Sequence, residues 1–214
     1  MTASSSRSDL ERLAAEIRAC RICLEMPAGR PLPHEPRPVL RVSTTARLLV
    51  AGQAPGARVH ASGLPFDDPS GDRLRAWMGV DRDAFYDASR IAFLPTGLCF
   101  PGYDSKGSDL PPRPECARAW HERVLALMPE VETILCVGGY AQRFHAARLG
   151  RPIAKTAKVD AIVRGWRDYA DLRPRLIPTP HPSWRNTMWL RRNPWFETEL
   201  LPELRAAVAA ALSD

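Results

Sequence analysis

Short apolar runs alternate with stretches of helical periodicity along this 214-residue chain, and that alternation constrains the fold more than any other feature. The apolar runs lie at residues 46–51, 90–96, 133–137 and 175–179. Apolar residues recur at helical spacing over residues 8–19, 70–78, 114–128, 140–149 and 196–212. Short continuous apolar runs suit strands that are buried on both faces. The alternation therefore predicts an α/β fold, with a parallel sheet covered by helices on both sides.

The size and composition fit one globular domain. Apolar residues make up 45% of the sequence, so a sizeable core can be buried. We expect a disordered, Ser-rich tail at residues 1–7 and a single domain over residues 8–214. The N-terminus lacks the apolar centre of a secretion signal, and no apolar run approaches the roughly 20 residues of a membrane span. These features predict a cytoplasmic monomer with no membrane partner.

The charge of the chain permits a nucleic-acid partner without demanding one. The sequence holds 30 basic and 24 acidic residues, a formal net charge of +6. Arg greatly outnumbers Lys, and Arg binds phosphate through two parallel hydrogen bonds, which leans slightly towards nucleic acid. A GC-rich genome would give the same bias, so the charge alone leaves a merely basic protein equally open.

The loop after the first predicted strand carries Gly52–Gln53–Ala54–Pro55–Gly56 and, further on, Phe66. Ligands of parallel sheets bind beyond the carboxyl ends of the strands, where this loop and the loops 95–113 and 180–195 lie. Glycines let the backbone approach a ligand, the Gln53 amide can both donate and accept hydrogen bonds, and Phe66 can stack on a flat ring. The alternative is an ordinary Gly/Pro turn with a core Phe.

The loop after the last predicted strand places His181 between two prolines and continues through Ser183–Trp184–Arg185–Asn186. A rigid His at the carboxyl end of a strand suits a group that meets charge in a fixed place. Aromatic and basic residues interleaved in one loop suit stacking on bases and contact with phosphates. A surface His with tryptophans packed into the core explains the same residues.

Four of the five cysteines are candidate metal ligands. Cys20 and Cys23 form a Cys-x-x-Cys pair, and Cys99 and Cys116 flank a Pro-rich loop. Disulfides are disfavoured in a reducing cytosol, so the pair with two further cysteines first indicates a metal site. Four unrelated buried cysteines are the alternative. Cys136 lies inside an apolar run and is expected in the core.

Together these segments resemble the uracil-DNA glycosylases. The segment 52–56 resembles the first signature of that family, His181–Pro182–Ser183 resembles the second, and Gly63–Leu64–Pro65–Phe66 looks like the segment that carries the base-stacking Phe. With the cysteines included, the chain is most similar to the iron–sulfur-containing branch often called family four. The resemblance spans roughly residues 14–205.

The resemblance implies a three-layer α/β/α fold around a four-stranded parallel sheet. It implies a DNA repair hydrolase that cuts the bond between a damaged base and deoxyribose, with the base flipped into a pocket. It also implies a 4Fe–4S cluster on Cys20, Cys23, Cys99 and Cys116, with zinc as the alternative.

The resemblance assigns roles residue by residue in the two signature loops. The backbone around Gly52, Gln53 and Ala54 would line the base pocket and help to place the attacking water, with Gln53 and His181 as catalytic residues. Phe66 would stack on the base, and His181 would stabilise negative charge on the leaving base. Asn186 would contact the base, and Ser183, Trp184 and Arg185 would press into the DNA as a wedge.

The chain departs from the family pattern where a carboxylate is expected. Gln53 and Ala54 occupy positions at which family members carry acidic residues, and Val59 and His60 replace an acidic pair. His60, Asp67 or Asp68 are candidate substitutes, and residues 94–97 lack the Asn that reads the uracil edge. Two functions stay open: a glycosylase for uracil or another deaminated base, and a damaged-DNA-binding protein that hydrolyses little.

Overall fold

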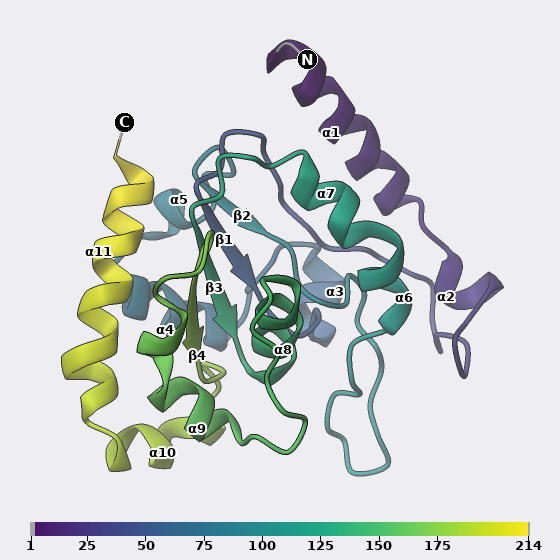
Figure 1. Ribbon diagram of the computed structural model, residues 1–214. Helices are drawn as coiled ribbons and strands as arrows, with labels where there is room; N and C mark the ends of the chain where they lie inside the picture. The colour runs from purple at the N-terminus through teal and green to yellow at the C-terminus, as the bar shows by residue number, and fades with distance from the viewer. Residues whose placement is uncertain (1–2, 214) are drawn as a thin grey trace.

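The computed structural model describes residues 3–213 and is built around a four-stranded, all-parallel sheet (Figure 1). The strand order is β2-β1-β3-β4, so the chain starts near the middle of the sheet and works outwards in both directions. The strands are β1 (Leu48–Ala51), β2 (Ile91–Phe93), β3 (Thr133–Val137) and β4 (Arg175–Thr179). All four fall within the predicted apolar runs, and the predicted parallel α/β fold is confirmed.

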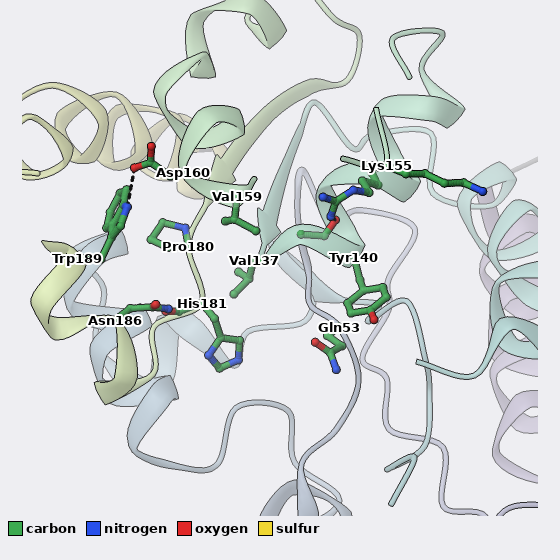
Figure 2. A pocket seen from close by; sticks show the side chains of 13 residues that line it. Gln53, Val137, Tyr140, Lys155, Val159, Asp160, Pro180, His181, Asn186 and Trp189 are labelled. Atoms are coloured by element: carbon green, nitrogen blue, oxygen red, sulfur yellow. Dashed lines mark hydrogen bonds between the residues drawn. The ribbon is translucent and has the colours of Figure 1, made fainter. Parts of the chain in front are cut away.

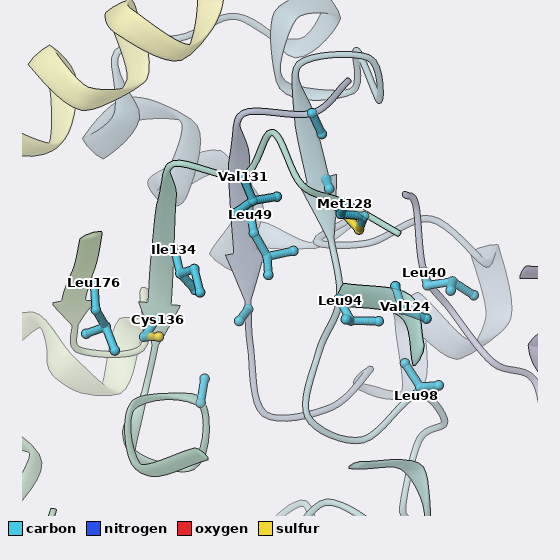
Figure 3. Packing of buried hydrophobic residues seen from close by; sticks show 14 of the residues in the cluster. Leu40, Leu49, Leu94, Leu98, Val124, Met128, Val131, Ile134, Cys136 and Leu176 are labelled. Atoms are coloured by element: carbon cyan, nitrogen blue, oxygen red, sulfur yellow. The ribbon is translucent and has the colours of Figure 1, made fainter. Parts of the chain in front are cut away.

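The strands are buried on both faces, which explains their continuous apolar sequences. Every residue of β1, β2 and β3 is buried. Alternate side chains point to opposite faces: Leu49 and Ile134 join one apolar cluster, whereas Leu48 and Leu135 join the other. Figure 3 shows the first cluster, with Leu49, Ile134 and Leu176 on neighbouring strands and Met128 from the connection that precedes β3. Each face therefore needs its own layer of helices.

The two faces are covered by different helices (Figure 1). One layer contains α1, α6, a π-helical turn, α7 and α8, at Ala3–Arg18, Pro114–Cys116, Ala117–His121, Glu122–Ala126 and Gly139–Arg148. The other contains α4, α5, a second π-helical turn and α11, at Pro69–Met78, Arg82–Phe85, Phe196–Leu200 and Leu201–Leu212. Short helices α2, α3, α9 and α10 and two 3₁₀ turns, at Ile22–Glu25, Ala57–Ser62, Val159–Arg164, Thr187–Arg192, Trp166–Tyr169 and Trp184–Asn186, lie in the connections.

The N-terminal helix begins earlier than the sequence pattern predicts. Helix α1 starts at Ala3, so residues 3–7 of the predicted disordered tail are helical, and residues 1–2 lie outside the described residues. The apolar face of the helix begins only at Leu10, which is why periodicity misses its polar first turns. Leu10, Leu13 and Ile17 then pack on the core. No helix in residues 3–213 is long and apolar enough to cross a membrane.

The buried His145 in α8 makes the stability of the fold sensitive to acid. Its side chain is fully buried, and neither ring nitrogen has a hydrogen-bond partner among the described residues. Burial, reinforced by the positive charge of Arg148, lowers the pKa of His145 from 6.5 to about 3. The unfolded chain therefore takes up a proton below pH 6.5 that the folded chain cannot.

We expect the free energy of unfolding to fall by about 2 kcal/mol at pH 5 through this one group. In His145→Leu that part of the acid loss disappears, and stability at neutral pH is kept or gained, because two unpaired polar atoms leave the core. Urea titrations of both proteins at pH 7 and pH 5 measure the difference. An equal loss of stability in the two proteins would contradict the assignment.

Candidate active site

A cleft of about 770 Å³ opens beyond the carboxyl ends of β1 and β2, where the sequence predicts a ligand site. Its volume lies within the usual range for small-molecule sites. Three separate loops form its walls, and the lining residues that matter chemically are Gln53, Phe66, Asp68, Asp109, His181 and Arg185. A second cavity, of about 660 Å³, shares Gln53, His181 and Asn186 with it as lining residues. The two signature loops, which are more than a hundred residues apart in sequence, thus share one cavity.

Phe66 lies on one wall of the cleft in an unusual backbone conformation. Its φ is 54°, in the left-handed region that a non-Gly residue rarely adopts. The ring packs beside Phe85 and Phe93, with centroid distances of 6.3 and 6.1 Å. Gly52 also faces the ring, since a Cβ at Gly52 would lie 3.5 Å from Phe66 Cζ. Contacts with Phe85, Phe93 and Gly52 therefore hold the Phe66 ring in one position, which stacking on a base requires.

Gly71 in α4 permits this position of Phe66. A Cβ on Gly71 would lie 1.8 Å from the Phe66 carbonyl oxygen, a distance that no packing tolerates. We expect Gly71→Ala to destabilise the fold by about 2–3 kcal/mol and to displace Phe66, although Ala is the better helix former.

Gly29→Ala is the matched control, since nothing lies within 4 Å of its Cβ position. Thermal unfolding of the two variants measures the difference. A Gly71→Ala protein as stable as the Gly29→Ala protein would contradict the close approach.

His181 presents a defined nitrogen to the cavity. The backbone N–H of Ser183 donates to His181 Nδ1 at 3.2 Å. With Nδ1 accepting, the proton of a neutral imidazole resides on Nε2, which becomes a donor. Figure 2 shows the His181 ring and the Gln53 side chain pointing into the same open space. A donor fixed in this way suits a group on which negative charge develops.

Desolvation keeps the His181 imidazole uncharged at neutral pH. Solvent reaches the His181 side chain through the cleft, but the surrounding protein atoms lower its pKa by desolvation. The carboxylates of Asp68 and Asp109 oppose the shift and raise the pKa only in part. At neutral pH the His181 ring is therefore uncharged and donates through Nε2, with the carboxylates of Asp68 and Asp109 nearby.

The two predicted amides brace the cleft. Gln53 Nε2 donates to the Leu110 carbonyl oxygen at 3.1 Å, which ties the first loop to the loop after β2. Asn186 Nδ2 donates to the His181 carbonyl oxygen at 2.7 Å and holds the last loop closed. Both residues line the cavity as predicted, but their NH₂ groups are already engaged within the protein. Their contacts with water and base stay predictions.

The wedge segment projects into solvent at the edge of the cleft. Trp184 is 75% exposed, the most exposed large apolar side chain among the described residues. The Arg185 guanidinium lies 6.0 Å from the centre of its ring. Ser183 caps this turn by accepting the Arg185 N–H, and Arg73 donates to the Ser183 carbonyl oxygen at 3.0 Å. A rigid base thus carries an exposed aromatic ring and a cation.

The other two tryptophans of this region are half-buried and pack against the core. Trp189 and Trp195 pack edge-on against each other and against Phe196. Trp189 also donates to Asp160 at 2.7 Å, as Figure 2 shows. The core alternative is therefore correct for these two side chains and wrong for Trp184.

The structure separates the three sequence candidates for the missing carboxylate. His60 packs against His34 and Phe100, with its ring centre 4.5 Å from that of His34, and does not line the cleft. Asp67 pairs with Arg82 at 3.4 Å and does not line it either. Only Asp68 does, and its Oδ1 accepts the N–H groups of residues 70 and 71 at the start of α4. Sequence reasoning missed a second cleft carboxylate, Asp109, which belongs to the loop after β2.

The four candidate cysteines lie close together beside α2 and α6. Cys20, Cys23, Cys99 and Cys116 line one small cavity between α2, the segment after β2 and α6, and all four thiols are free. Burial raises the pKa of Cys116 to about 11, and the nearby thiolates of Cys20 and Cys23 add to the rise. Cys136 is buried in β3 away from this cavity, as predicted.

The donor set of this cavity suits a group that binds several thiolates. No group of three or more His, Cys, Asp or Glu residues in the described chain surrounds a single metal-ion position. Four thiolates brought together can hold a 4Fe–4S cluster or a zinc ion. Glu115 closes the cavity wall, since it pairs with Arg113 at 2.5 Å and accepts the Ala28 N–H at 2.8 Å.

The fold and the cleft together define a parallel α/β protein in which an aromatic ring and a neutral histidine line one cleft beyond the carboxyl ends of the strands. A family model described as the uracil DNA glycosylase superfamily matches residues 41–205. The match covers well over half of the chain, so this protein belongs to the uracil DNA glycosylase superfamily. The matched region includes all three cleft loops. It begins after Cys20 and Cys23, so the match does not test the proposed set of four cysteines.

Proposed function

We propose that this protein is a DNA glycosylase that hydrolyses the bond between deoxyribose and uracil or another deaminated base. One observation carries the proposal: His181 Nε2–H and the Phe66 ring face the same cleft, in a chain of this superfamily. A flat ring held against Phe66 would lie in the cleft that also contains this fixed, uncharged donor. DNA with a damaged base is the partner that this arrangement fits.

The chemistry follows from charge that appears only during bond cleavage. When the bond between the base and C1′ of deoxyribose breaks, the electron pair stays on the base, which becomes an anion. A neutral donor fixed at that place stabilises the transition state more than the substrate. The substrate base must leave the duplex to reach the cleft, and Trp184 or Arg185 is suited to fill the gap. His181 is therefore the principal catalytic residue of this proposal.

The four cysteines support a place in the iron–sulfur branch of the superfamily. We propose that Cys20, Cys23, Cys99 and Cys116 hold a 4Fe–4S cluster, with zinc as the alternative. The group would be structural, since it would join α2 and the loop 27–38 to the loop after β2. The loop after β2 also forms one wall of the cleft. A group bound to the cysteines would therefore hold that wall in place.

A second function, damaged-base recognition with little hydrolysis, is favoured by one observation. The first signature loop carries no carboxylate, and its Gln53 amide is tied to Leu110. A scaffold that bound a flipped base without activating water would look similar.

An excision assay separates the two functions. Labelled oligonucleotides with uracil, hypoxanthine or xanthine, single- and double-stranded, are incubated with the protein and then treated with alkali. Cleavage at the damaged position supports the glycosylase and names its base. Tight binding without cleavage on every strand would contradict it and favour the recognition protein.

A further inference from the structure

We infer that Asp109 is a catalytic carboxylate of the cleft, supplied by the loop after β2 in place of the acidic residue that the first signature loop lacks. This inference rests on the proposed glycosylase function and assigns the group that activates the water. It concerns a residue that no sequence motif singles out.

The backbone places Asp109 over the first signature loop. A β-bridge joins Asp109 to Tyr103, which folds the loop into a narrow arch. Gln53 Nε2 holds the next residue, Leu110, at 3.1 Å through its carbonyl oxygen. A Cβ on Gly56 would lie 3.9 Å from Asp109 Oδ2, so the carboxylate faces the backbone of residues 52–56. Gln53, which stands where family members carry an acidic residue, therefore helps to hold Asp109 in place.

The Asp109 carboxylate is free to act on water. Among the residues that the structure describes, it has no hydrogen bond and no ion pair, and its side chain is open to solvent at the cleft. The titratable and charged groups that face it are the His181 imidazole, which is neutral at neutral pH, the Arg185 guanidinium and the Asp68 carboxylate. Desolvation by the cleft walls raises the pKa of Asp109, while His181 and Arg185 lower it. A carboxylate with a raised pKa is a stronger base for a bound water than an ordinary surface Asp.

Asp68, the other cleft carboxylate, is already engaged. Its Oδ1 accepts two backbone N–H groups at 2.8 and 3.1 Å and caps α4. This oxygen is therefore committed to the start of the helix. Asp68 is thus suited to keep the cleft negative, which favours positive charge on the sugar, whereas Asp109 is the carboxylate without another task.

The proposed step is balanced. Asp109 accepts one proton from a water molecule as the water oxygen forms a bond to C1′ of the deoxyribose. The bond between C1′ and the base breaks, and its electron pair leaves with the base, which accepts a hydrogen bond from His181 Nε2. The proton on Asp109 then passes through solvent to the base anion. The products are the neutral base and an abasic site, and both side chains return to their initial states.

The test compares Asp109→Asn with Asp104→Asn. Asp104 belongs to the same loop, does not line the cleft, and accepts the N–H groups of Lys106 and Ser108, a role that Asn can share. Single-turnover excision is measured on the base and strand that the wild-type protein cleaves fastest. We expect Asp109→Asn to slow excision about 10²-fold with little change in DNA affinity, and Asp104→Asn to excise at the wild-type rate.

A pH series separates catalysis from a structural effect. The wild-type rate should fall as Asp109 is protonated at low pH, and Asp109→Asn should lack this limb. Excision by Asp109→Asn at the wild-type rate, or equal losses in both variants, would overturn the assignment while leaving the glycosylase function intact. A wild-type protein that releases no base from any strand would overturn both.

Discussion

Replacing His181 with alanine should slow base excision by about 10²–10³-fold while leaving affinity for the damaged strand within a few-fold of the wild type. The reason is that the Nε2–H donor meets negative charge only as the base leaves, so its removal costs the transition state more than the bound substrate. Single-turnover rates and equilibrium binding on the same oligonucleotide measure the two quantities separately. Losses of equal size in both would show that His181 only binds.

Two conservative variants refine this prediction. The Ser183 N–H occupies Nδ1, so the donor that matters lies at the Nε2 end of the ring. The amide nitrogen of Gln reaches about as far as Nε2, whereas that of Asn reaches only about as far as Nδ1. We therefore expect His181→Gln to retain more excision activity than His181→Asn. The reverse order would contradict the tautomer assigned to His181.

If the proposed metal group is held by the four cavity cysteines, substituting any of them with alanine should prevent its binding and destabilise the protein severely. Metal-binding free energy is folding free energy when the ligands come from separate segments, as they do here. Cys99→Ala is the most informative case, because Cys99 is buried and lies in the segment after β2 that also leads to the cleft. We expect the purified variant to lose its iron, about four atoms per chain in the wild type, and its visible absorbance.

Cys136→Ala is the matched control for this prediction. Cys136 is fully buried in β3 but lies outside the cysteine cavity, so the substitution removes a thiol without removing a ligand. Its cost should be a modest core loss, with full iron content. Zinc in place of iron in the wild-type and Cys136→Ala proteins, with no metal in Cys99→Ala, would establish the zinc alternative. Equal metal content in the Cys99→Ala and Cys136→Ala proteins would contradict the proposed site.

The sheet was predictable from sequence because its strands are buried on both faces. A strand such as β3 must then be apolar at every position, and such a run stands out against the polar loops. The long helices were predictable for the related reason that each buries one stripe. Helices α3 and α10 have six residues each and lie at the cleft, where loop residues rather than an apolar stripe decide their position.

Residues of the cleft were predictable only where the local sequence restricts the backbone. His181 is framed by prolines and Phe66 follows a Gly-Leu-Pro segment, so both were found from sequence. Asp109 was missed because its position depends on tertiary contacts, namely the bridge to Tyr103 and the Gln53–Leu110 hydrogen bond. His60 and Asp67 were plausible substitutes by sequence distance, but their side chains find partners outside the cleft.

The central claim is that this protein releases a free base from DNA, and the direct measurement is the released base itself. Wild-type protein is incubated with a single-stranded uracil oligonucleotide, and free uracil is quantified by mass spectrometry beside the length of the strand. We expect one free uracil per damaged strand, with the strand uncut until alkali is added. The same experiment with hypoxanthine and xanthine strands ranks the bases. Bound but unreleased bases on all three strands would contradict the central claim.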